Sequence, residues 1–335
     1  MKEVVAGVDL GGTSTKLGLI TRKGQLLCKT SIDTDSTKGY EYFFDRVSSE
    51  FSELLSPFNG DVTIKGIGIG APDANSIDGK IYYASNLAWT GIIPIVDLIE
   101  SKTNLPVTLM NDANAAAIGE KLFGVATAMN DFIAITLGTG LGSGIVIHGE
   151  IVLGHNSHAG ELGHTTAFYN GRICGCGKRG CLESYVSATG IVRSLWELLE
   201  STNHKSILRE LAPSDVSAKM ITEAARRGDE LALEVFDYTA KILGIKLAEF
   251  VAFSNPEAII FSGGLTNAGD ILLKPTKKYM EENLMEVYKD KVKIIKSGLV
   301  LEDVGILGAA ASIWNKIDSD SSNKDLQKLT PIKNT

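Results

Sequence analysis

The chain has 335 residues, of which 44% are hydrophobic and 22% charged, and it is long enough for two lobes that each bury a core. Its formal net charge of −7 disfavours nucleic acid as a partner, because phosphate backbones bind to basic surfaces. It contains no run of about 18 uncharged apolar residues and starts without the apolar core of a secretory signal, so we expect no membrane partner and a cytoplasmic protein with reduced thiols.

The first third of the chain predicts a meander of strands followed by alternating helices and strands. Short apolar runs are separated by Gly-rich turns, and a later Asp/Asn-initiated segment closes at a glycine. The elements expected here are strands at 4–10, 16–20, 25–30, 63–72 and 106–110, and helices near 40–55 and near 111–124.

A second copy of the opening pattern begins near Phe132. Both segments read as strand, Gly/Thr turn, strand, Gly turn and strand. When Leu10 is aligned with Leu137, the turn residue Gly24 falls near Gly149. Because each copy stands at the start of one half of the chain, the repeat predicts two related halves.

The remainder of the second half predicts a long helix, a strand and a closing helix. Apolar residues recur at helical spacing from Leu231 to Ile245. An apolar strand then leads into the Gly turn at 263–264, and a tightly packed helix is expected at 304–314.

These elements predict the domain organisation. We expect an N-terminal α/β lobe at 1–122, completed by the final helix at about 303–316, and a C-terminal α/β lobe at 123–302. The polar residues 318–335 predict a loosely ordered tail.

Two Gly/Thr-rich turns, Leu10–Lys16 and Leu137–Gly144, are the first candidates for chemistry. Neither contains the Walker A pattern, and neither leads into a helix as a dinucleotide-binding turn does. Either turn alone fits an ordinary β-turn. Hairpin turns with consecutive glycines can nonetheless direct backbone N–H groups at a phosphate, and a matching pair in two related halves favours that role. The residues involved are Gly11, Gly12, Thr13, Lys16, Gly138, Thr139 and Gly140.

Asp112 lies between a predicted strand and a predicted helix. One interpretation is a helix N-cap, a position that Asp and Asn fill well. The other is a general base, because a helix N-terminus keeps a carboxylate ionised and kinases use an Asp to deprotonate the attacking hydroxyl. The two interpretations are compatible, and the neighbouring Asn111 offers a donor and an acceptor that suit a polyol.

Three of the four cysteines share one Gly-rich loop with a histidine, in the spacing His164-x9-Cys174-x-Cys176-x4-Cys181. Three thiolates and one imidazole complete a tetrahedral site without an open position, which is typical of structural zinc. The alternatives are a redox pair, for which a C-x-x-C spacing is absent, and buried cysteines, which do not cluster in Gly/Lys/Arg-rich sequence. The loop therefore predicts a zinc site, and Cys28 is expected in the core or at an edge.

Two carboxylates flank this loop. Glu161 precedes His164 by three residues, and Glu183 follows Cys181 by two. They fit ordinary surface glutamates, but a metal that fixes the loop also fixes the side chains it carries. With one ring nitrogen on the metal, His164 must carry a proton on the other, so the three side chains could grip several hydroxyls of one sugar.

Together these motifs resemble the ROK family of repressors and sugar kinases, and most of all its bacterial glucokinases. The resemblance runs from Val4 to about Trp314 and rests on GVDLGGTSTK, MNDANAAAIGE, TLGTGLGSG, GELGH followed by CGCGKRGCLESYVSATG, and FSGGL. It implies the actin-like, hexokinase-type ATPase fold, with two α/β lobes and an interlobe cleft. It also implies phosphoryl transfer from ATP, with Mg2+, to the 6-hydroxyl of a hexose, glucose before others, and suggests a homodimer.

The resemblance also implies roles for single residues. Asp112 matches the catalytic base. The matches to the sugar ligands are Asn86, Asn111, Asp112, Glu161, His164 and Glu183. The matches to the zinc ligands are His164, Cys174, Cys176 and Cys181. The matches to the ATP site are Gly11, Gly12, Thr13, Lys16, Gly138, Thr139 and Gly140 at the phosphates, and Gly263 and Gly264 at the nucleoside.

One loop departs from the family pattern. Where the family usually has Gly-x-Pro-Gly, this chain has GAPD, with Asp73 at the last glycine. Because that loop approaches the sugar, N-acetylmannosamine, N-acetylglucosamine and fructose stay open as alternatives to glucose.

Two further readings are a non-catalytic sugar sensor and a zinc-knuckle nucleic-acid binder. A sensor does not need the base Asp112, and a zinc knuckle would need basic residues interleaved with aromatics, which the sequence lacks. The family's repressors carry a helix-turn-helix ahead of the kinase-like region, and here the first Gly turn already begins at Leu10.

Overall fold

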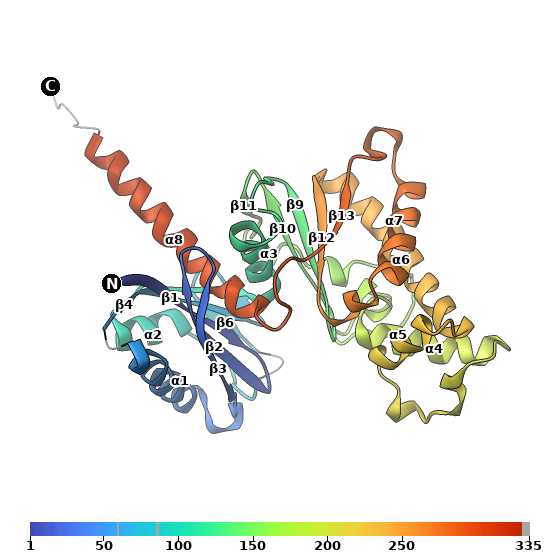
Figure 1. Cartoon of the computed structure of the whole chain (residues 1–335), viewed down its shortest axis with the longest axis horizontal. Helices are drawn as coiled ribbons and strands as arrows, with labels where there is room; N and C mark the ends of the chain where they lie inside the picture. Colours follow the sequence, from blue (N-terminus) through green and yellow to red (C-terminus); the bar gives the residue numbers. More distant parts are fainter. Residues whose placement is uncertain (59, 85–86, 330–335) are drawn as a thin grey trace. The chain divides into compact units, whose positions relative to one another are not determined.

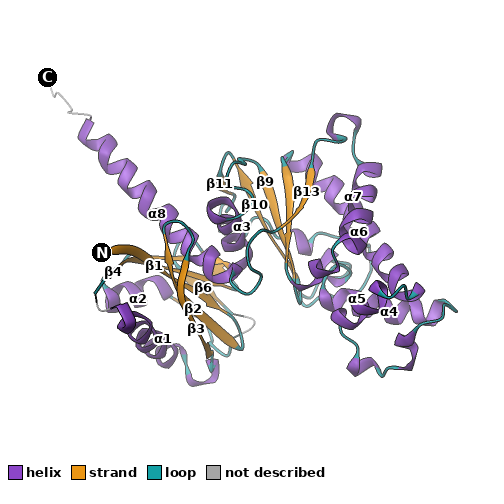
Figure 2. Ribbon diagram, viewed as in Figure 1, coloured by secondary structure: helices purple, strands orange, loops and turns teal. Residues whose placement is uncertain are grey.

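The computed structural model describes residues 1–58, 60–84 and 87–329 (Figures 1 and 2). The chain forms two compact units. The first unit contains Met1–Thr127, Leu153–Ala159 and Glu302–Thr335, and the second contains Ala128–Val152 and Gly160–Leu301. The first unit is therefore assembled from three separate stretches of the chain.

The first unit is built on a five-stranded sheet. Its strands are β1 (Lys2–Leu10), β2 (Ser14–Thr21), β3 (Leu26–Asp33), β4 (Val62–Ala71) and β8 (Val107–Asn111). They lie in the order β3-β2-β1-β4-β8. The pairs β1–β2 and β2–β3 are antiparallel, whereas β1, β4 and β8 run parallel. The nearly continuous apolar runs of β1 and β4 suit strands that are buried on both faces.

Helices and a small second sheet complete the first unit. The elements are α1 (Tyr40–Leu55), α2 (Ile95–Thr103), α3 (Asp112–Phe123), α8 (Val304–Leu329), β5 (Ala74–Asn75), β6 (Lys80–Tyr82), β7 (Ile92–Ile93), and the 3₁₀ turns η1 (Ser36–Lys38) and η2 (Ser56–Phe58). The helices predicted near 40–55 and near 111–124 are confirmed. Phe43 and Phe44 of α1 pack against Trp89, with ring centroids 5.2 and 6.1 Å away.

The second unit contains another five-stranded sheet, in the order β11-β10-β9-β12-β13. Its strands are β9 (Phe132–Leu137), β10 (Leu141–Ile147), β11 (Glu150–Ile151), β12 (Ala258–Ser262) and β13 (Lys293–Lys296). Its helices are α4 (Ala188–Ser201), α5 (Ala218–Arg226), α6 (Glu230–Ser254) and α7 (Asp270–Asn283). Its 3₁₀ turns are η3 (Leu162–His164), η4 (Leu182–Ser184), η5 (Ile207–Glu210), η6 (Pro213–Asp215), η7 (Gly264–Ala268) and η8 (Glu286–Tyr288).

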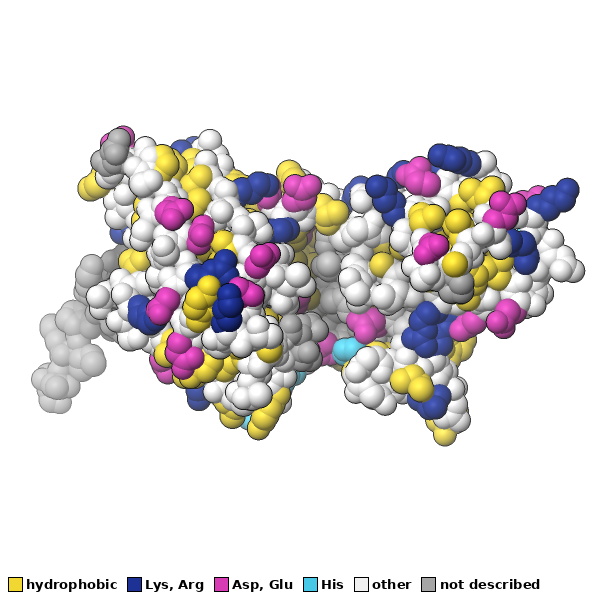
Figure 3. Space-filling model, turned by 90° about the horizontal axis from the view of Figure 1, so that it is seen from below, with side chains coloured by type: hydrophobic (Ala, Val, Ile, Leu, Met, Phe, Trp, Pro, Cys, Tyr) yellow, Lys and Arg dark blue, Asp and Glu magenta, His cyan; other side chains and the backbone are white. Residues whose placement is uncertain are grey.

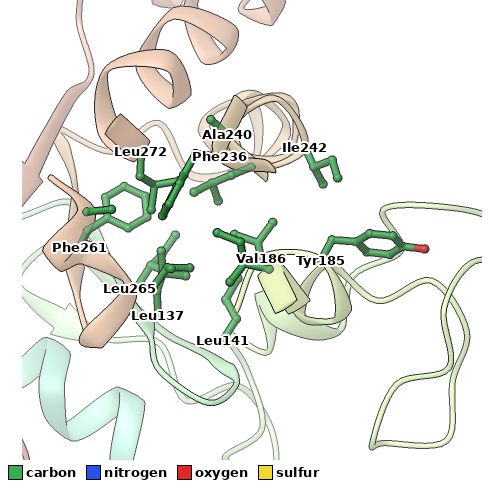
Figure 4. Close-up of a cluster of buried hydrophobic side chains, with 14 of the residues drawn as sticks. Leu137, Leu141, Tyr185, Val186, Phe236, Ala240, Ile242, Phe261, Leu265 and Leu272 are labelled. Atoms are coloured by element: carbon green, nitrogen blue, oxygen red, sulfur yellow. The ribbon is translucent and has the colours of Figure 1, made fainter. Parts of the chain in front are cut away.

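The core of the second unit joins its sheet to its helices. Figure 4 shows Leu137 and Leu141 of the sheet converging with Phe236 of α6, Phe261 of β12 and Leu272 of α7. All five side chains are buried. The long helix predicted from Leu231 is confirmed as α6 and is buried on more than the predicted stripe, because it packs against both α4 and α7.

The predicted internal repeat is confirmed in three dimensions. In each sheet the first strand pairs antiparallel with the second, the second with the third, and the first runs parallel to the fourth. The hairpin glycines aligned from the sequence, Gly24 and Gly149, both have positive φ, at 76° and 81°. Only a residue without a Cβ adopts that conformation at no steric cost, which explains why glycine stands at both turns.

Helix α8 lies against a glycine-lined face of the first sheet. A methyl group at Gly7 would overlap the carbonyl oxygen of Ile306, and one at Gly68 would overlap that of Ala309. The missing side chains thus allow helix and sheet backbones to approach closely, and the prediction of a tightly packed closing helix is confirmed.

The prediction of a loosely ordered tail from residue 318 is wrong as far as Leu329. Helix α8 continues to Leu329, because no glycine or proline interrupts the sequence after Trp314 until Pro331. Arg22 supports the extension, since it forms an ion pair with Asp318 and its guanidinium lies 4.8 Å from the ring centroid of Trp314. Within the described ranges, neither this helix nor another combines the length and the apolar character that crossing a bilayer requires.

The close approach of α8 predicts a selective loss of stability. Gly68→Ala should lower the free energy of unfolding by about 1–3 kcal/mol, as overpacking a core does, because the added methyl overlaps a helix carbonyl. Gly70→Ala on the same strand is the control, since its methyl would meet its nearest neighbour at an ordinary 3.6 Å. Urea unfolding of both variants is the measurement, and equal losses would contradict the role of the glycine face.

Candidate functional site

Three acidic side chains of the first unit lie at one edge of its sheet. The strands β1, β4 and β8 are neighbours and run parallel, so their carboxyl ends meet at the same edge. Asp9 lies near the end of β1, Asp73 follows β4, and Asp112 follows β8. In the pairing of β4 with β8, Ala71 stands opposite Asn111, which places the residues after them on neighbouring strand ends.

Asn111, and not Asp112, caps helix α3. The Oδ1 atom of Asn111 accepts hydrogen bonds from the backbone N–H groups of Ala113 and Asn114, at 3.0 and 3.4 Å. Asp112 is the first helical residue, and its Oδ1 accepts from Ala113 N at 2.8 Å. The N-cap interpretation of Asp112 is therefore wrong. Its carboxylate has more acceptor sites than this one bond uses.

Desolvation by the surrounding protein and the charge of Asp73 raise the pKa of Asp112, although its side chain is accessible to solvent. Desolvation has the largest effect, and the charge of Asp73 adds to it, while the backbone N–H groups of Ala113 and Asp112 act in the opposite direction. Burial also raises the pKa of Asp9, with Lys16 lowering it and Asp112 raising it. Carboxylates with a raised pKa take up protons more readily, so this edge has the character of an acid–base site.

Asp9 is a site candidate that the sequence-based prediction missed. Its signal was a charged residue in an otherwise apolar strand, directly before the first Gly turn. The structure also places it against the first turn of α8, because a methyl group at Gly305 would overlap its carboxylate. A helix N-terminus stabilises a negative charge nearby, so part of the role of Asp9 is structural.

The first Gly/Thr turn connects β1 to β2 and is held by Thr34. Thr34 donates its backbone N–H to Thr13 O at 2.8 Å and its hydroxyl to Gly11 O at 2.6 Å. Lys16, opposite Asp9 in the strand pairing, donates to Glu302 O at 3.1 Å. The structure thus brings the predicted residues Gly11, Gly12, Thr13 and Lys16 together in one fixed hairpin. Thr34 carried no motif that could have revealed it.

Two further segments of the first unit were predicted to reach the sugar. Asp73 has a φ of 53°, in the left-handed region that favours glycine. Asp adopts that region more readily than most residues, so the loop keeps a glycine-like backbone while it gains a carboxylate. The other predicted residue, Asn86, lies outside the described residues.

The second Gly/Thr turn borders a cavity of about 730 Å³ in the second unit. Gly138 and Thr139 line it together with Ala188 of α4 and Gly264 of η7. Gly263 has a φ of 92°, and a methyl group there would overlap the backbone of Leu137, so a glycine is required where β12 ends beside β9. The structure therefore brings the two predicted Gly turns of this unit to one cavity, whose volume suits a small-molecule ligand.

Helix α5 forms another wall of this cavity, and none of its residues was predicted. Lys219, Thr222, Glu223 and Arg226 line the cavity from the helix. Arg226 is fixed by Glu223 at 2.6 Å and by the carbonyl of Asn267 at 2.6 Å. These residues show no recognisable spacing in the sequence and become site candidates only through the fold.

The predicted zinc ligands form one cluster. The ligand atoms of His164, Cys174, Cys176 and Cys181 all lie within 4.8 Å of one another. Cys174 Sγ is 3.7 Å from His164 Nδ1, and Cys176 Sγ is 3.7 Å from Cys181 Sγ. Ligands of tetrahedral zinc with Zn–S bonds of about 2.3 Å are separated by about 3.8 Å, so these residues could hold a zinc ion.

The protonation of the cluster is linked to metal binding. Burial, with the neighbouring thiols of Cys176 and Cys174, raises the pKa of Cys181 to about 12. A metal ion binds the thiolate and must displace that proton. Metal affinity should therefore fall as the pH is lowered.

The predicted sugar ligands of the second unit lie on two 3₁₀ turns. Glu161 directly precedes η3, which ends at His164, and Glu183 lies in η4. Because His164 Nδ1 faces the cysteines, Nε2 is the nitrogen left to carry a proton. Glu183 also makes a contact that was not predicted. Its Oε2 accepts a hydrogen bond from Leu141 N at 2.9 Å, at the end of the second Gly turn.

Charged side chains elsewhere on the second unit are mixed in sign. The charged residues that line an open groove of about 580 Å³ along α7 are Asp270, Lys274, Lys277, Lys278, Glu281 and Lys296. Lys274 pairs with Asp270 at 2.7 Å. On the face seen in Figure 3, acidic and basic side chains are likewise interspersed. Neither feature is the single-sign surface that a nucleic-acid partner needs.

The fold and the site define a class of protein. Two sheets share one strand order, each opens with a Gly/Thr hairpin turn, a carboxylate with a raised pKa stands at one sheet edge, and a cavity adjoins the second turn. These features define an actin-like, hexokinase-type ATPase fold, as predicted. The pattern that describes the ROK family matches residues 5–316, and the chain belongs to this family.

Relatives of known name cover almost the whole chain. A glucokinase from Thermotoga maritima is 37% identical over 316 residues, covering 93% of this chain and 97% of its own. A glucokinase from Halalkalibacterium halodurans is 37% identical over 306 residues, covering 90% and 92%. The crystal structure of a ROK family glucokinase from Streptomyces griseus, in complex with glucose and AMPPNP, is 32% identical with a TM-score of 0.75, and the match covers 92% of this chain and 98% of that one.

The Cys/His cluster predicts one bound metal ion per chain in protein purified without added metal. Cys176→Ser removes one thiolate and should lower the metal content well below one per chain. Cys28→Ser is the matched control, because Cys28 lies in β3 and its thiol donates to Leu54 O instead. Elemental analysis of the three proteins is the measurement, and an active, folded parent without metal would contradict the prediction.

Proposed function

We propose that this ROK protein, an ATP-dependent sugar kinase, transfers the γ-phosphoryl group of ATP to the 6-hydroxyl of glucose. The observation that carries the proposal is the position of Asp112, a solvent-accessible carboxylate with a raised pKa at the start of a helix that Asn111 caps. A base with these properties suits deprotonation of a hydroxyl. The glucokinase relatives, and the glucose and AMPPNP bound in one of the similar structures, support glucose and ATP as the substrates.

In the reaction, Asp112 accepts the proton of the 6-hydroxyl. The hydroxyl oxygen forms a bond to the γ-phosphorus as the bond from that phosphorus to the β–γ bridging oxygen breaks, and glucose 6-phosphate and ADP are the products. Because desolvation and Asp73 raise the pKa of Asp112, the proton transfer is more favourable than to an ordinary carboxylate.

For the sugar we propose a set of acceptors and donors. Ionised carboxylates only accept hydrogen bonds, whereas His164, with Nδ1 facing the thiol of Cys174, would donate from Nε2. Such a set can pair with neighbouring hydroxyls of one pyranose. Its members are Asn86, Asn111, Asp112, Glu161, His164 and Glu183.

For ATP we propose the cavity beside Gly138 and Thr139 and the Gly turn at 11–13. Backbone N–H groups of Gly-rich turns suit phosphates, and the turn at 263–264 suits the nucleoside. Mg2+, when bound, would offset the charge of the phosphates. Asp9 is the carboxylate that we propose to hold it, because it lies near the end of β1, directly before the first Gly turn, and carboxylate oxygens are ligands that Mg2+ prefers.

For the Cys/His cluster we propose structural zinc. Four protein ligands leave no open position for substrate, so the ion would stabilise the loop that carries Glu161 and Glu183. The expected cytoplasmic location and homodimer stay predictions.

Asp112→Asn should lower kcat by about 10²–10⁴-fold, because the amide cannot take up the hydroxyl proton. Sugar binding should survive, since an amide still hydrogen-bonds a hydroxyl. Steady-state kinetics with glucose and ATP is the measurement. Asp97→Asn, which changes an exposed carboxylate in the first turn of α2, is the matched control and should keep the parental kcat.

Two outcomes would contradict this role of Asp112. Turnover within a few-fold of the parent would show that the reaction does not use it as a base. A parent protein that binds glucose but never phosphorylates it would instead favour the alternative of a non-catalytic sugar sensor.

Glucose should be the preferred sugar, with mannose weaker. The proposed set pairs best with neighbouring equatorial hydroxyls, and sites built this way reject analogues that leave a polar group unpaired, by about 10⁴-fold or more in strong cases. An N-acetyl group at carbon 2 needs extra room near the loop of Asp73. We expect kcat/KM to be highest for glucose among glucose, mannose, fructose, N-acetylglucosamine and N-acetylmannosamine. A tenfold preference for an N-acetylated sugar would overturn glucose but leave the base and the metal site untouched.

A further inference from the structure

Arg172 reaches into the interior of the second unit from residues 164–181, the loop of the Cys/His cluster, here called the metal loop. Its side chain is only 6% exposed, which requires that its charge be paired. The guanidinium binds both carboxylate oxygens of Glu197 on α4, from Nε at 2.8 Å and from Nη2 at 2.6 Å. Nη2 also donates to Ser194 Oγ at 3.0 Å. A fork of this kind is rigid and cannot be reproduced by lysine.

The same guanidinium joins both ends of a short stretch of backbone, residues 183–190, here called the bracing segment. Nη1 donates to Ser184 O at 2.8 Å and to Gly190 O at 3.1 Å. Within the segment, the ring of Tyr185 lies 4.2 Å from the guanidinium, and its hydroxyl accepts from Arg172 N at 2.9 Å. Arg172 therefore fixes the shape of the bracing segment from the side of the metal loop.

The bracing segment in turn holds the second Gly/Thr turn, residues 138–141, here called the nucleotide turn. Three hydrogen bonds connect them. They are Leu141 N to Glu183 Oε2 at 2.9 Å, Ala188 N to Gly138 O at 2.8 Å, and Thr189 Oγ1 to Thr139 O at 3.0 Å. A side chain at Gly140 would also overlap the carboxylate of Glu183, so the two elements are in direct contact.

The two elements share the wall of one cavity, because Gly138 and Thr139 of the nucleotide turn and Ala188 of the bracing segment all line it. We infer that Arg172 is a positioning residue for nucleotide binding, and that the metal loop sets the geometry of the nucleotide turn as well as that of the sugar ligands. This inference rests on the proposed ATP site. Arg172 touches neither the cavity nor a proposed ligand residue through its guanidinium, so it acts through the bracing segment.

The test is direct binding of AMPPNP, without sugar, to the metal-containing protein. Arg172→Gln should raise the dissociation constant for AMPPNP by about tenfold or more, because charge-assisted hydrogen bonds to two carbonyl groups are lost. Arg172→Lys keeps the charge but not the fork and should lie between parent and Arg172→Gln. The KM for ATP should rise more than kcat falls, and AMPPNP affinity should fall by more than glucose affinity, to which Glu183 of the bracing segment also contributes. Metal content should stay within about threefold of the parent, as expected if the arginine acts on the nucleotide turn rather than on the whole unit.

Two further variants keep the test independent of folding defects. Thr189 is exposed, and its hydroxyl donates to Thr139 O and also contacts Ser187 Oγ within the bracing segment. Thr189→Val removes this hydroxyl and should also weaken AMPPNP binding. Arg193→Gln is the matched control. Arg193 also donates from α4 to the metal loop, at Ile173 O, but it is exposed and takes part in none of the three hydrogen bonds between the bracing segment and the nucleotide turn. This variant should bind AMPPNP like the parent.

Unchanged AMPPNP binding in Arg172→Lys and Thr189→Val would overturn the inference. Equal losses of AMPPNP affinity, glucose affinity and metal content in the Arg172 variants would also overturn it, because they would show a general structural role. A parent that does not bind AMPPNP would mean that the proposed function fails, and the inference with it. If the parent binds AMPPNP and every variant binds it equally well, the inference about Arg172 is wrong and the proposed function is unaffected.

Discussion

The parallel pairing of neighbouring strands is the constraint on which the candidate site depends. In the first unit it brings the first Gly/Thr turn, Asp73 and Asp112 to the carboxyl ends of three adjacent strands. In the second unit, β9 and β12 are parallel neighbours with Thr136 opposite Ser262, so the Gly turns that follow them emerge together and border one cavity. A slip of one residue in either pairing would turn these side chains to the opposite face.

Much of this arrangement could be predicted from the sequence, because its signals are local. The Gly/Thr turns and the Cys/His loop are short stretches of sequence, and the repeat compares two such stretches. The structure confirms the two related sheets and brings the four Cys/His side chains together. Gly24 and Gly149 both adopt a positive φ, and this conformation could be predicted because each glycine stands in a short turn. These local signals were therefore sufficient to predict the fold and the position of the metal loop.

The residues that the sequence did not reveal act over long distances in the chain. Thr34, Arg226 and Arg172 hold turns and loops that lie elsewhere in the sequence, and they belong to no motif. The sequence also could not decide whether Asp112 caps α3. Either of two adjacent residues could do so, and only the structure shows that Asn111 does. The helical end of α8 was missed because polar composition was read as disorder, although nothing there breaks a helix.

The glycine face beneath α8 has a consequence for synthesis on the ribosome. The first unit begins at Met1 but includes Glu302 and the residues after it, whereas the main part of the second unit ends at Leu301. As the chain emerges from its N-terminus, the first sheet must wait for almost the entire polypeptide before α8 can cover its glycines. The second unit can acquire its own core earlier, so the half that is made first is the half that finishes folding last.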